Sequence, residues 1–502
     1  MSLLGVDVGS GSCKAVVFGE DGTLEGQAGR PYQMSVPAPG RAEMDAEALW
    51  QAVVETIREL AQVHGRKIEA LAIAAHGETV IAVDADGRPV GPALMNADNR
   101  AVEETCALES SVGREEIYRL TGLPPHPMFA ITKIMWLQRH APALYAKAKR
   151  FLSVEDYVLG RLGLPPYTDY SLACRTMAFD LHRQDWSPEI LRAAGLRADQ
   201  LGLPVPSGQK LGTLSAATAA ALGLREGTIV GSGGHDQPTG ALGAGVVDPG
   251  QVANSAGTYE CLAAVSEAPR NTPAALGFSL NSYCHVVPGQ YVTLAFFPAG
   301  LVSRWLVEQL CGEDRLEAQR SDRDLYDLLD HKAAQDCPGP TGLCLMPHFV
   351  GACTPHWDPR ATGAIVGLTP AHTRYHLYKA GYEAIACELA LNLAVLADLA
   401  GPFERVVIHG GNARSSSWVQ LRADITGTTM VRLPTTEAVC RGAAMLAGTA
   451  AGVFAQAREA ALRWRLSSPE FRPEALSRAA YAPQIAQYQR LFGALAETRN
   501  RG

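Results

Sequence analysis

Residues 229–245 read Ile-Val-Gly-Ser-Gly-Gly-His-Asp-Gln-Pro-Thr-Gly-Ala-Leu-Gly-Ala-Gly, and the rest of the chain is organised around this stretch. Residues 228–230 predict a buried strand, and the glycines after it allow a tight turn that brings one polar side chain to the strand end. That side chain belongs to Asp236. A carboxylate there can act as the general base that takes the proton of an alcohol. It can equally cap the helix that follows, and this stretch alone leaves both alternatives open.

A strand, a polar turn and a second strand are expected at the N-terminus. Residues 3–8 and 14–18 are apolar runs, and residues 9–12, Gly-Ser-Gly-Ser, lie between them. Such a turn offers backbone N–H groups and hydroxyls to a phosphate, and Asp7 just before it can hold a magnesium ion directly or through water. A purely structural turn is the alternative, because similar hairpins occur in many proteins.

Residues 250–265 repeat this pattern, with Gly257 and Thr258 in the turn. The carboxylate occurs only in the first copy, since Ser255 stands where Asp7 does. Two similar hairpins about 250 residues apart predict a duplicated domain whose two turns face each other across a cleft. A shared phosphate chain is a ligand that such a cleft could bind.

Polar side chains interrupt the strands predicted within residues 68–83, and a second polar set follows at residues 96–100. Carboxylate, amide and guanidinium groups in such places suit sugar hydroxyls. The candidates for sugar contact are His76, Glu78, Asp98 and Arg100. The alternatives are a satisfied core histidine for His76 and an ordinary ion pair between Asp98 and Arg100.

The remaining segments predict packing and lid elements. Residues 103–150 and 186–224 have a helical pattern, and residues 374–398 predict a long helix. Residues 153–162 and 167–176 predict an inserted helix and a polar hairpin. A strand over residues 405–408 ends in a Gly-Gly turn ahead of a helix over residues 418–426. That geometry is common for nucleotides, although one such turn does not prove a nucleotide site.

Composition narrows the classes of partner. The chain has 502 residues, 47% apolar and 19% charged, which predicts a globular protein of two or three domains. A net charge of -7 gives no footprint for nucleic acid or for an anionic membrane, so small molecules are the expected partners. The eleven cysteines form no Cys-x-x-Cys pair, and no apolar run approaches the ~20 residues of a membrane helix. We therefore expect a cytoplasmic protein.

The order of these motifs resembles the FGGY family of carbohydrate kinases, which includes glycerol kinase and xylulokinase, over almost the whole chain. Segments similar to the first phosphate loop, the catalytic aspartate segment, the second phosphate loop and the adenosine segment lie at residues 6–14, 233–237, 255–258 and 410–424. The resemblance implies an α/β fold of two actin-like ATPase domains of ribonuclease-H type, with a nucleotide cleft between them. We expect a sugar-binding kinase domain over residues 1–245 and a nucleotide-binding kinase domain over residues 246–502, with a flexible stretch at 240–250 near the hinge.

The resemblance also implies a role for each matching residue. Asp236 would take the proton from the substrate hydroxyl, Asp7 would help to hold Mg²⁺, and Gln237 would join the sugar contacts. ATP would contact Gly9, Ser10, Gly11, Ser12, Lys14, Gly257, Thr258, Gly300, Arg304, Gly411, Asn412 and Ser415. Arg304 stands where many relatives have Gln.

The substrate face departs from both named kinases. Glu78 and Thr79 are similar to glycerol kinase, but Gly77 replaces the arginine before that glutamate, and xylulokinases have Gln-Met-His-Gly here. The resemblance thus implies phosphorylation of a hydroxyl of a small sugar or polyol, either a ketose such as xylulose or a sugar alcohol. The rivals are an actin-like ATPase, which the polar set argues against, and an inactive sugar sensor, which Asp7 and Asp236 argue against. The oligomeric state stays open, with a homodimer as one alternative.

Overall fold

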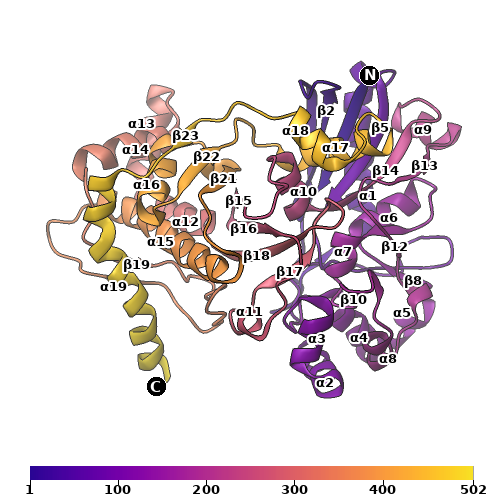
Figure 1. Ribbon diagram of the computed structural model, residues 1–502, viewed down its shortest axis with the longest axis horizontal. Helices are drawn as coiled ribbons and strands as arrows, with labels where there is room; N and C mark the ends of the chain where they lie inside the picture. The colour runs from indigo at the N-terminus through magenta and orange to yellow at the C-terminus, as the bar shows by residue number, and fades with distance from the viewer. Residues whose placement is uncertain (501–502) are drawn as a thin grey trace.

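The computed structural model describes residues 1–500, and its first half is built on a six-stranded sheet of order β13-β14-β5-β1-β2-β3 (Figure 1). Its strands are β1 (Ser2–Val8), β2 (Ser12–Gly19), β3 (Leu24–Pro31), β5 (Ile68–Ala75), β13 (Lys210–Thr213) and β14 (Ile229–His235). β2 runs antiparallel to both of its neighbours, β1 and β3, whereas β5 is parallel to both β1 and β14. β1 is buried almost throughout, which is typical of a strand covered on both faces.

The second half is built on a seven-stranded sheet of order β17-β18-β16-β15-β21-β22-β23. Its strands are β15 (Val252–Ala256), β16 (Tyr259–Ser266), β17 (Asn281–Cys284), β18 (Tyr291–Pro298), β21 (Arg405–His409), β22 (Thr429–Arg432) and β23 (Glu470–Phe471). β16 runs antiparallel to its neighbours β15 and β18, and β21 runs parallel to its neighbours β15 and β22. Five strands therefore repeat the order and directions of β3-β2-β1-β5-β14. The predicted duplication and fold class are confirmed.

Helices from both halves cover the first sheet. α1 (Ala46–His64) packs on β2 and β3 through a buried face that includes Leu49, Val53 and Ile57, and the Asp45 side chain caps its N-terminus. α17 (Ala438–Ala450) comes from the other end of the chain, yet it contacts β1, β5 and β14, and Figure 1 shows it with α18 (Ala457–Arg463) beside this sheet. On the second sheet, α15 (Arg374–Ala400) contacts β16 and β18, and α16 (Ser416–Thr426) contacts β22.

The smaller helices of the first half lie mostly between β7 and β14 in the chain. They are α2 (Val102–Val112), α3 (Arg114–Thr121), α4 (Ala130–His140), α5 (Pro142–Lys147), α6 (Val154–Arg161), α7 (Tyr170–Cys174), α8 (Pro188–Ala193), η1 (Ala198–Gln200), α9 (Ala216–Leu222) and α10 (Asp236–Gly243). Short strands accompany them: β4 (Glu43–Met44), β6 (Ile81–Val83), β7 (Ala93–Leu94), β8 (Arg150–Leu152), β9 (Tyr167–Asp169), β10 (Phe179–Asp180), β11 (Asp185–Trp186) and β12 (Leu203–Val205). The second half adds α11 (Pro273–Gly277), α12 (Gly300–Leu310), α13 (Gly312–Ser321), α14 (Leu325–Asp336), β19 (Cys344–Met346), β20 (Ala364–Val366), η2 (Gly411–Ala413) and α19 (Ala475–Asn500).

The helical prediction for residues 186–224 is wrong in its middle. Only the ends of that range are α-helices, α8 and α9, and β12 and β13 lie between them. Pro204 and Pro206 exclude a helix interior there, because proline lacks the backbone N–H and clashes with the preceding turn. The hairpin expected over residues 167–176 is likewise absent, since β9 pairs in parallel with β12 and leads into α7.

The stretch expected to be flexible begins inside a tightly packed helix. Residues 240–243 belong to α10, and α10 packs against α17. A Cβ atom on Gly243 would lie 1.8 Å from the Ala438 carbonyl oxygen, and one on Gly442 would lie 1.9 Å from that of Thr239. Residues 240–243 are thus held in a close helix–helix contact, and only residues 244–251 form a loop between the two halves.

In the part of the chain that the structure describes, no helix is both long and apolar enough to cross a membrane. The eleven cysteines are all free thiols.

Candidate active site

Asp236 is the first residue of α10, directly after β14. His235, and not Asp236, is the N-cap residue of this helix, which does not support the capping alternative. The Asp236 Oδ1 atom is buried without a hydrogen-bond partner in the described residues, although His235 Nε2 lies 3.2 Å away. Burial, followed by the carboxylates of Asp7 and Glu78, raises the pKa of Asp236 to about 8. A carboxyl group with that pKa suits proton transfer near neutral pH.

Asp7 lies near the end of β1 and shares the unusual state of Asp236. Its Oδ1 atom is also buried without a hydrogen-bond partner among residues 1–500. Burial raises the pKa of Asp7 to about 7, against the lowering effect of Lys14 and with a further raising effect of Glu437. Buried carboxylates are normally paired, so two unpaired oxygens in one region fit a divalent cation, and Mg²⁺ prefers carboxylate and water oxygens.

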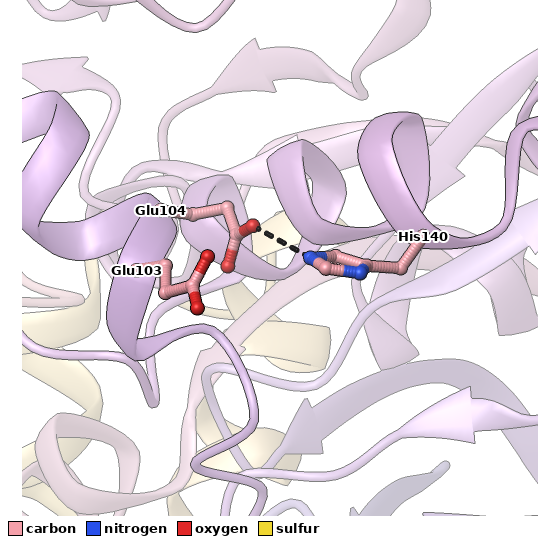
Figure 2. A group of neighbouring side chains, drawn as sticks. All are labelled: Glu103, Glu104 and His140. Atoms are coloured by element: carbon pink, nitrogen blue, oxygen red, sulfur yellow. Dashed lines mark hydrogen bonds and ion pairs between the residues drawn. The ribbon is translucent and has the colours of Figure 1, made fainter.

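A second acidic group lies between α2 and α4, where Glu103, Glu104 and His140 approach one another (Figure 2). His140 Nε2 is 3.2 Å from Glu104 Oε1. Arg139 Nη1 lies 3.0 Å from Glu103 Oε2 and 3.6 Å from Glu104 Oε1. This guanidinium ties both carboxylates into an ion-pair network, in which Glu104 Oε2 remains buried without a hydrogen-bond partner among the described residues.

The first predicted phosphate turn is a compact loop with an exposed tip. The Gly9 N–H donates to the Ser12 carbonyl at 3.0 Å, and the Tyr32 N–H donates to the Gly11 carbonyl at 3.0 Å. Ser10 and Gly11 are exposed at the tip. Lys14 follows in β2, with its Nζ atom 3.4 Å from Glu437 Oε1.

The second turn brings three of the predicted nucleotide contacts together. The Gly257 carbonyl oxygen accepts from the Gly300 N–H at 3.1 Å and from Asn412 Nδ2 at 3.0 Å. A Cβ atom on Gly300 would lie 2.5 Å from that oxygen, so α12 must begin with glycine to approach so closely. Thr258 and Arg304 line a pocket of about 680 Å³ beside this turn, with Trp305.

The predicted adenosine segment follows β21. Gly410 has a φ of 98° and would place a Cβ atom 2.7 Å from the Ala256 carbonyl oxygen, which explains the glycine. Gly411 opens the short helix η2, and Ser415 caps α16. Ser415 Oγ also donates to Asp330 Oδ2 at 2.7 Å. Sequence reasoning missed Asp330, because it lies 85 residues away on α14 with no local signal.

Three of the predicted sugar contacts are held by protein groups. His76 Nδ1 donates to the Val8 carbonyl at 2.9 Å, so Nε2 accepts from the Thr79 hydroxyl at 2.8 Å. Burial lowers the pKa of His76, which favours the neutral imidazole that these two hydrogen bonds require. Arg100 Nε donates to Asp98 Oδ1 at 2.9 Å, and its guanidinium lies over the Trp136 ring. Both alternatives raised from the sequence thus describe the contacts seen, and sugar binding by these residues stays a prediction.

Glu78 lies closer to the reacting region, and its left-handed backbone has a φ of 62°. Arg175 Nε donates to Glu78 Oε1 at 2.6 Å, and Arg175 Nη1 donates to Asn281 Oδ1 at 3.0 Å. Lys133 Nζ donates to the Glu78 carbonyl at 3.1 Å. Tyr283 lies in β17 like Asn281, and its hydroxyl forms a hydrogen bond of 2.7 Å with His235 Nδ1. The second half therefore contributes to the region around Asp236, which the sequence did not reveal.

Comparison with known proteins agrees with this geometry. Residues 2–243 match the N-terminal domain of the FGGY family of carbohydrate kinases, and residues 252–451 match its C-terminal domain. The chain belongs to the FGGY family of carbohydrate kinases. As a member of this family, it is a carbohydrate kinase. The predicted boundary after Gly245 falls between the two matches, but α17 packs on the first sheet, so the division of the chain stays a prediction.

Two named relatives of this FGGY kinase differ in their substrates. It is 32% identical over 508 residues to the autoinducer-2 kinase of Klebsiella pneumoniae, covering 98% of this chain and 93% of the relative. It is 29% identical over 454 residues to the gluconokinase of Bacillus subtilis, covering 90% and 88%.

Solved structures show the same fold. The gluconate kinase of Lactobacillus acidophilus has a TM-score of 0.88 at 24% identity, covering 99% of this chain and 98% of its own. The glycerol kinase of Plasmodium falciparum with ADP has a TM-score of 0.85 at 20% identity, covering 97% of both chains.

Proposed function

We propose that this FGGY kinase transfers the terminal phosphoryl group of ATP to a hydroxyl of a small neutral sugar or polyol, with Asp236 as general base. The observation that carries the proposal is the pair of buried, unpaired carboxylate oxygens on Asp7 and Asp236. Positioning and charge neutralisation are most of what phosphoryl transfer requires. A ketose such as xylulose, or a sugar alcohol, is the expected acceptor.

The roles of the chain follow from its contacts. Asp236 Oδ1 accepts the proton of the substrate hydroxyl, since no donor among residues 1–500 forms a hydrogen bond with that atom. Asp7 would hold Mg²⁺, which when bound neutralises phosphate charge. Ser10 and Gly11, which are exposed at the tip of the first turn, and Thr258 of the second turn would contact the phosphates from the two halves.

The charges near Glu78 favour a neutral substrate over an acid such as gluconate. The Arg175 guanidinium already donates to the side chains of Glu78 and Asn281. Lys133 Nζ donates to the carbonyls of Glu78 and Met95 at 3.1 and 2.5 Å. A buried cation that is already paired gains little from a substrate carboxylate, because its existing contacts would have to break.

The test is an assay of ADP release over pentuloses, hexuloses, alditols and gluconate, each with ATP and Mg²⁺. We expect turnover to depend on the acceptor and to be highest with a neutral ketose or alditol. ATP hydrolysis that ignores the acceptor would indicate an ATPase, and acceptor binding without ADP release would indicate a sensor. Highest kcat/KM with gluconate would contradict the neutral class and leave the kinase assignment intact.

A further inference from the structure

Strand β14 does not run regularly into Asp236. Its pairing with β5 shifts register between Gly231 and Gly234, so Ser232 and Gly233 together face Ile73. This is a β-bulge, which re-aims the side chains that follow it. A Cβ atom on Gly233 would lie 1.8 Å from the Ile73 carbonyl oxygen, so the bulge is pressed tightly onto β5.

Side chains, and not strand partners, hold two backbone N–H groups of β14, one inside the bulge and one two residues beyond it. The Gly233 N–H donates to Glu155 Oε1 on α6 at 2.7 Å. The His235 N–H, one residue before Asp236, donates to Ser171 Oγ on α7 at 2.8 Å. Glu155 and Ser171 are both fully buried. Glu155 supplies an acceptor inside the bulge, where the ladder is disrupted, and Ser171 supplies one to the residue that directly precedes Asp236.

Asp169 joins the two anchors into one unit. Its N–H donates to Glu155 Oε2 at 3.3 Å, and its carboxylate accepts from Ser171 Oγ at 2.9 Å and from Ser207 Oγ at 2.6 Å. Asp169 is also fully buried, so this network is shielded from water. In such a buried environment, losing a hydrogen bond is costly because no water replaces the missing partner.

We propose that Glu155 and Ser171 are positioning residues, which fix the bulge of β14 and thereby aim the Asp236 carboxylate at the substrate hydroxyl. Neither side chain is seen to contact Asp236 itself, and both act on the backbone that leads into it. The inference rests on the proposed role of Asp236 as general base. A misplacement of about 1 Å at a reacting group can cost roughly 10²-fold in rate, which sets the size of the expected effect.

The chemistry of Glu155 supplies a discriminating pair of variants. Burial, with Asp169 adding to it, raises the pKa of Glu155 well above its usual range, so a neutral amide resembles the native group. Glu155→Gln keeps one acceptor oxygen, which we expect to face the Gly233 N–H because that hydrogen bond, at 2.7 Å, is shorter than the 3.3 Å bond from the Asp169 N–H. Glu155→Leu keeps the volume but removes both acceptors. Ser171→Ala removes the acceptor of the His235 N–H with a smaller change in volume.

The experiment measures kcat, the two KM values and the melting temperature for these three variants. We expect Glu155→Leu to lose roughly 10²-fold in kcat, Ser171→Ala to lose less, and Glu155→Gln to stay near wild type, all with KM for ATP nearly unchanged. Val158→Ala is the control. Val158 is a fully buried residue of the same helix, so truncating it should destabilise the protein, but its apolar side chain makes no hydrogen bond to the bulge.

Asp236→Asn is measured alongside to separate two kinds of failure. If Asp236→Asn is inactive but both Glu155→Leu and Ser171→Ala keep wild-type kcat, the positioning role is wrong and the base survives. A Glu155→Gln or Val158→Ala variant that loses as much kcat as Glu155→Leu would also overturn it, because the effect would then be loss of stability. If Asp236→Asn keeps full turnover, the base assignment fails, and the positioning role fails with it. Should Glu155→Leu not fold, Ser171→Ala decides the question.

Discussion

The site depends on two carboxyl groups that the fold holds at an energetic disadvantage. Asp7 and Asp236 each bury one oxygen that no described protein group satisfies, and burial is the leading cause of both raised pKa values. Such strain is common where a charged ligand completes the structure.

Replacing Asp236 by Asn should abolish most of the chemistry. The amide keeps the shape but cannot accept the proton, so we expect kcat to fall by about 10²–10⁴-fold while both substrates still bind. In the wild type, kcat/KM should rise with pH and level off above about pH 8, because Asp236 must be deprotonated in the free enzyme. Steady-state kinetics over the pH range check both, and wild-type turnover by Asp236→Asn would remove the residue from this role.

The same substitution should stabilise the ligand-free protein at high pH. The usual pKa of Asp is about 3.9, and in the fold that of Asp236 is about 8, so the proton stabilises the folded state. That stability is fully present below about pH 4 and is lost as pH rises through 8. Asn never acquires the buried charge, so Asp236→Asn should melt a few degrees above wild type at pH 9 and level with it near pH 4. Melting curves in chelator test this, and a variant that melts lower at pH 9 would contradict the raised pKa.

At the scale of elements, the helix pair α10–α17 joins the halves more tightly than any loop could. Thr239 and Ala438 present backbone carbonyls to glycines of the facing helix at distances that admit no Cβ atom. Glycine is thus required for helix–helix contact here and not for a turn.

Gly442→Ala should therefore destabilise the protein, although alanine is the better helix former. Overpacking of this kind costs about 1–3 kcal/mol, and the clash is with backbone, so we expect the upper end. Gly160→Ala is the control, because a Cβ atom on Gly160 of α6 meets nothing within 4 Å. Denaturant unfolding measures both, and equal stabilities for the two variants would show that α10 and α17 can separate at no cost.

The C-terminal helix α19 is fastened by buried carboxylates of α15. Tyr488 donates its hydroxyl proton to Glu388, and Gln484 Nε2 donates to Glu383 Oε2 at 2.8 Å. Burial raises the pKa of Glu388 to about 7, which makes the Tyr488 hydrogen bond a principal support for this carboxyl group.

Tyr488→Phe should cost about 1.5–3 kcal/mol, because it leaves a buried, partly charged acceptor short of a donor. Turnover should not change, since the elements that α19 mainly packs against, α15, α16 and β19, carry neither Asp7 nor Asp236. Urea unfolding and the ADP-release assay together check this, and a loss of turnover without a loss of stability would contradict a purely structural role for the helix.

At the scale of the whole molecule, the two halves of the chain contact each other in a second place besides the α10–α17 pair. Tyr118 OH donates to the Leu280 carbonyl at 2.9 Å, and the Ser282 N–H donates to the Gly122 carbonyl at 2.8 Å, so β17 rests on α3 and the start of the next loop. Relative motion must therefore pivot near β17 and the α10–α17 pair.

Closure should require both substrates, because the residues proposed to contact the sugar lie mainly in the first half and those proposed to contact the nucleoside in the second. Small-angle scattering of the free protein, each single complex, and the complex with sugar and a non-hydrolysable nucleotide tests this. We expect the smallest radius of gyration in the last sample. A constant radius in all four, with binding confirmed independently, would rule out the hinge.

The sequence by itself determined the duplicated fold and the order of the sites along it. Alternating apolar strands and Gly-rich turns are local signals, so Asp7 and Asp236 could be placed at strand ends from neighbouring residues alone. The same logic found Gly257 and the turn at Gly410 and Gly411, and at Gly410 the close approach of the Ala256 carbonyl admits no other residue.

Only the tertiary structure decided which polar groups remain available for chemistry. Arg175 meets Glu78 across 97 residues and Asn281 across 106, and no local pattern encodes such a contact. His76 and the Asp98–Arg100 pair have side chains as polar as that of Asp236, yet the fold satisfies them with protein partners. A buried group becomes reactive when its partner is withheld, and that depends on every element packed around it.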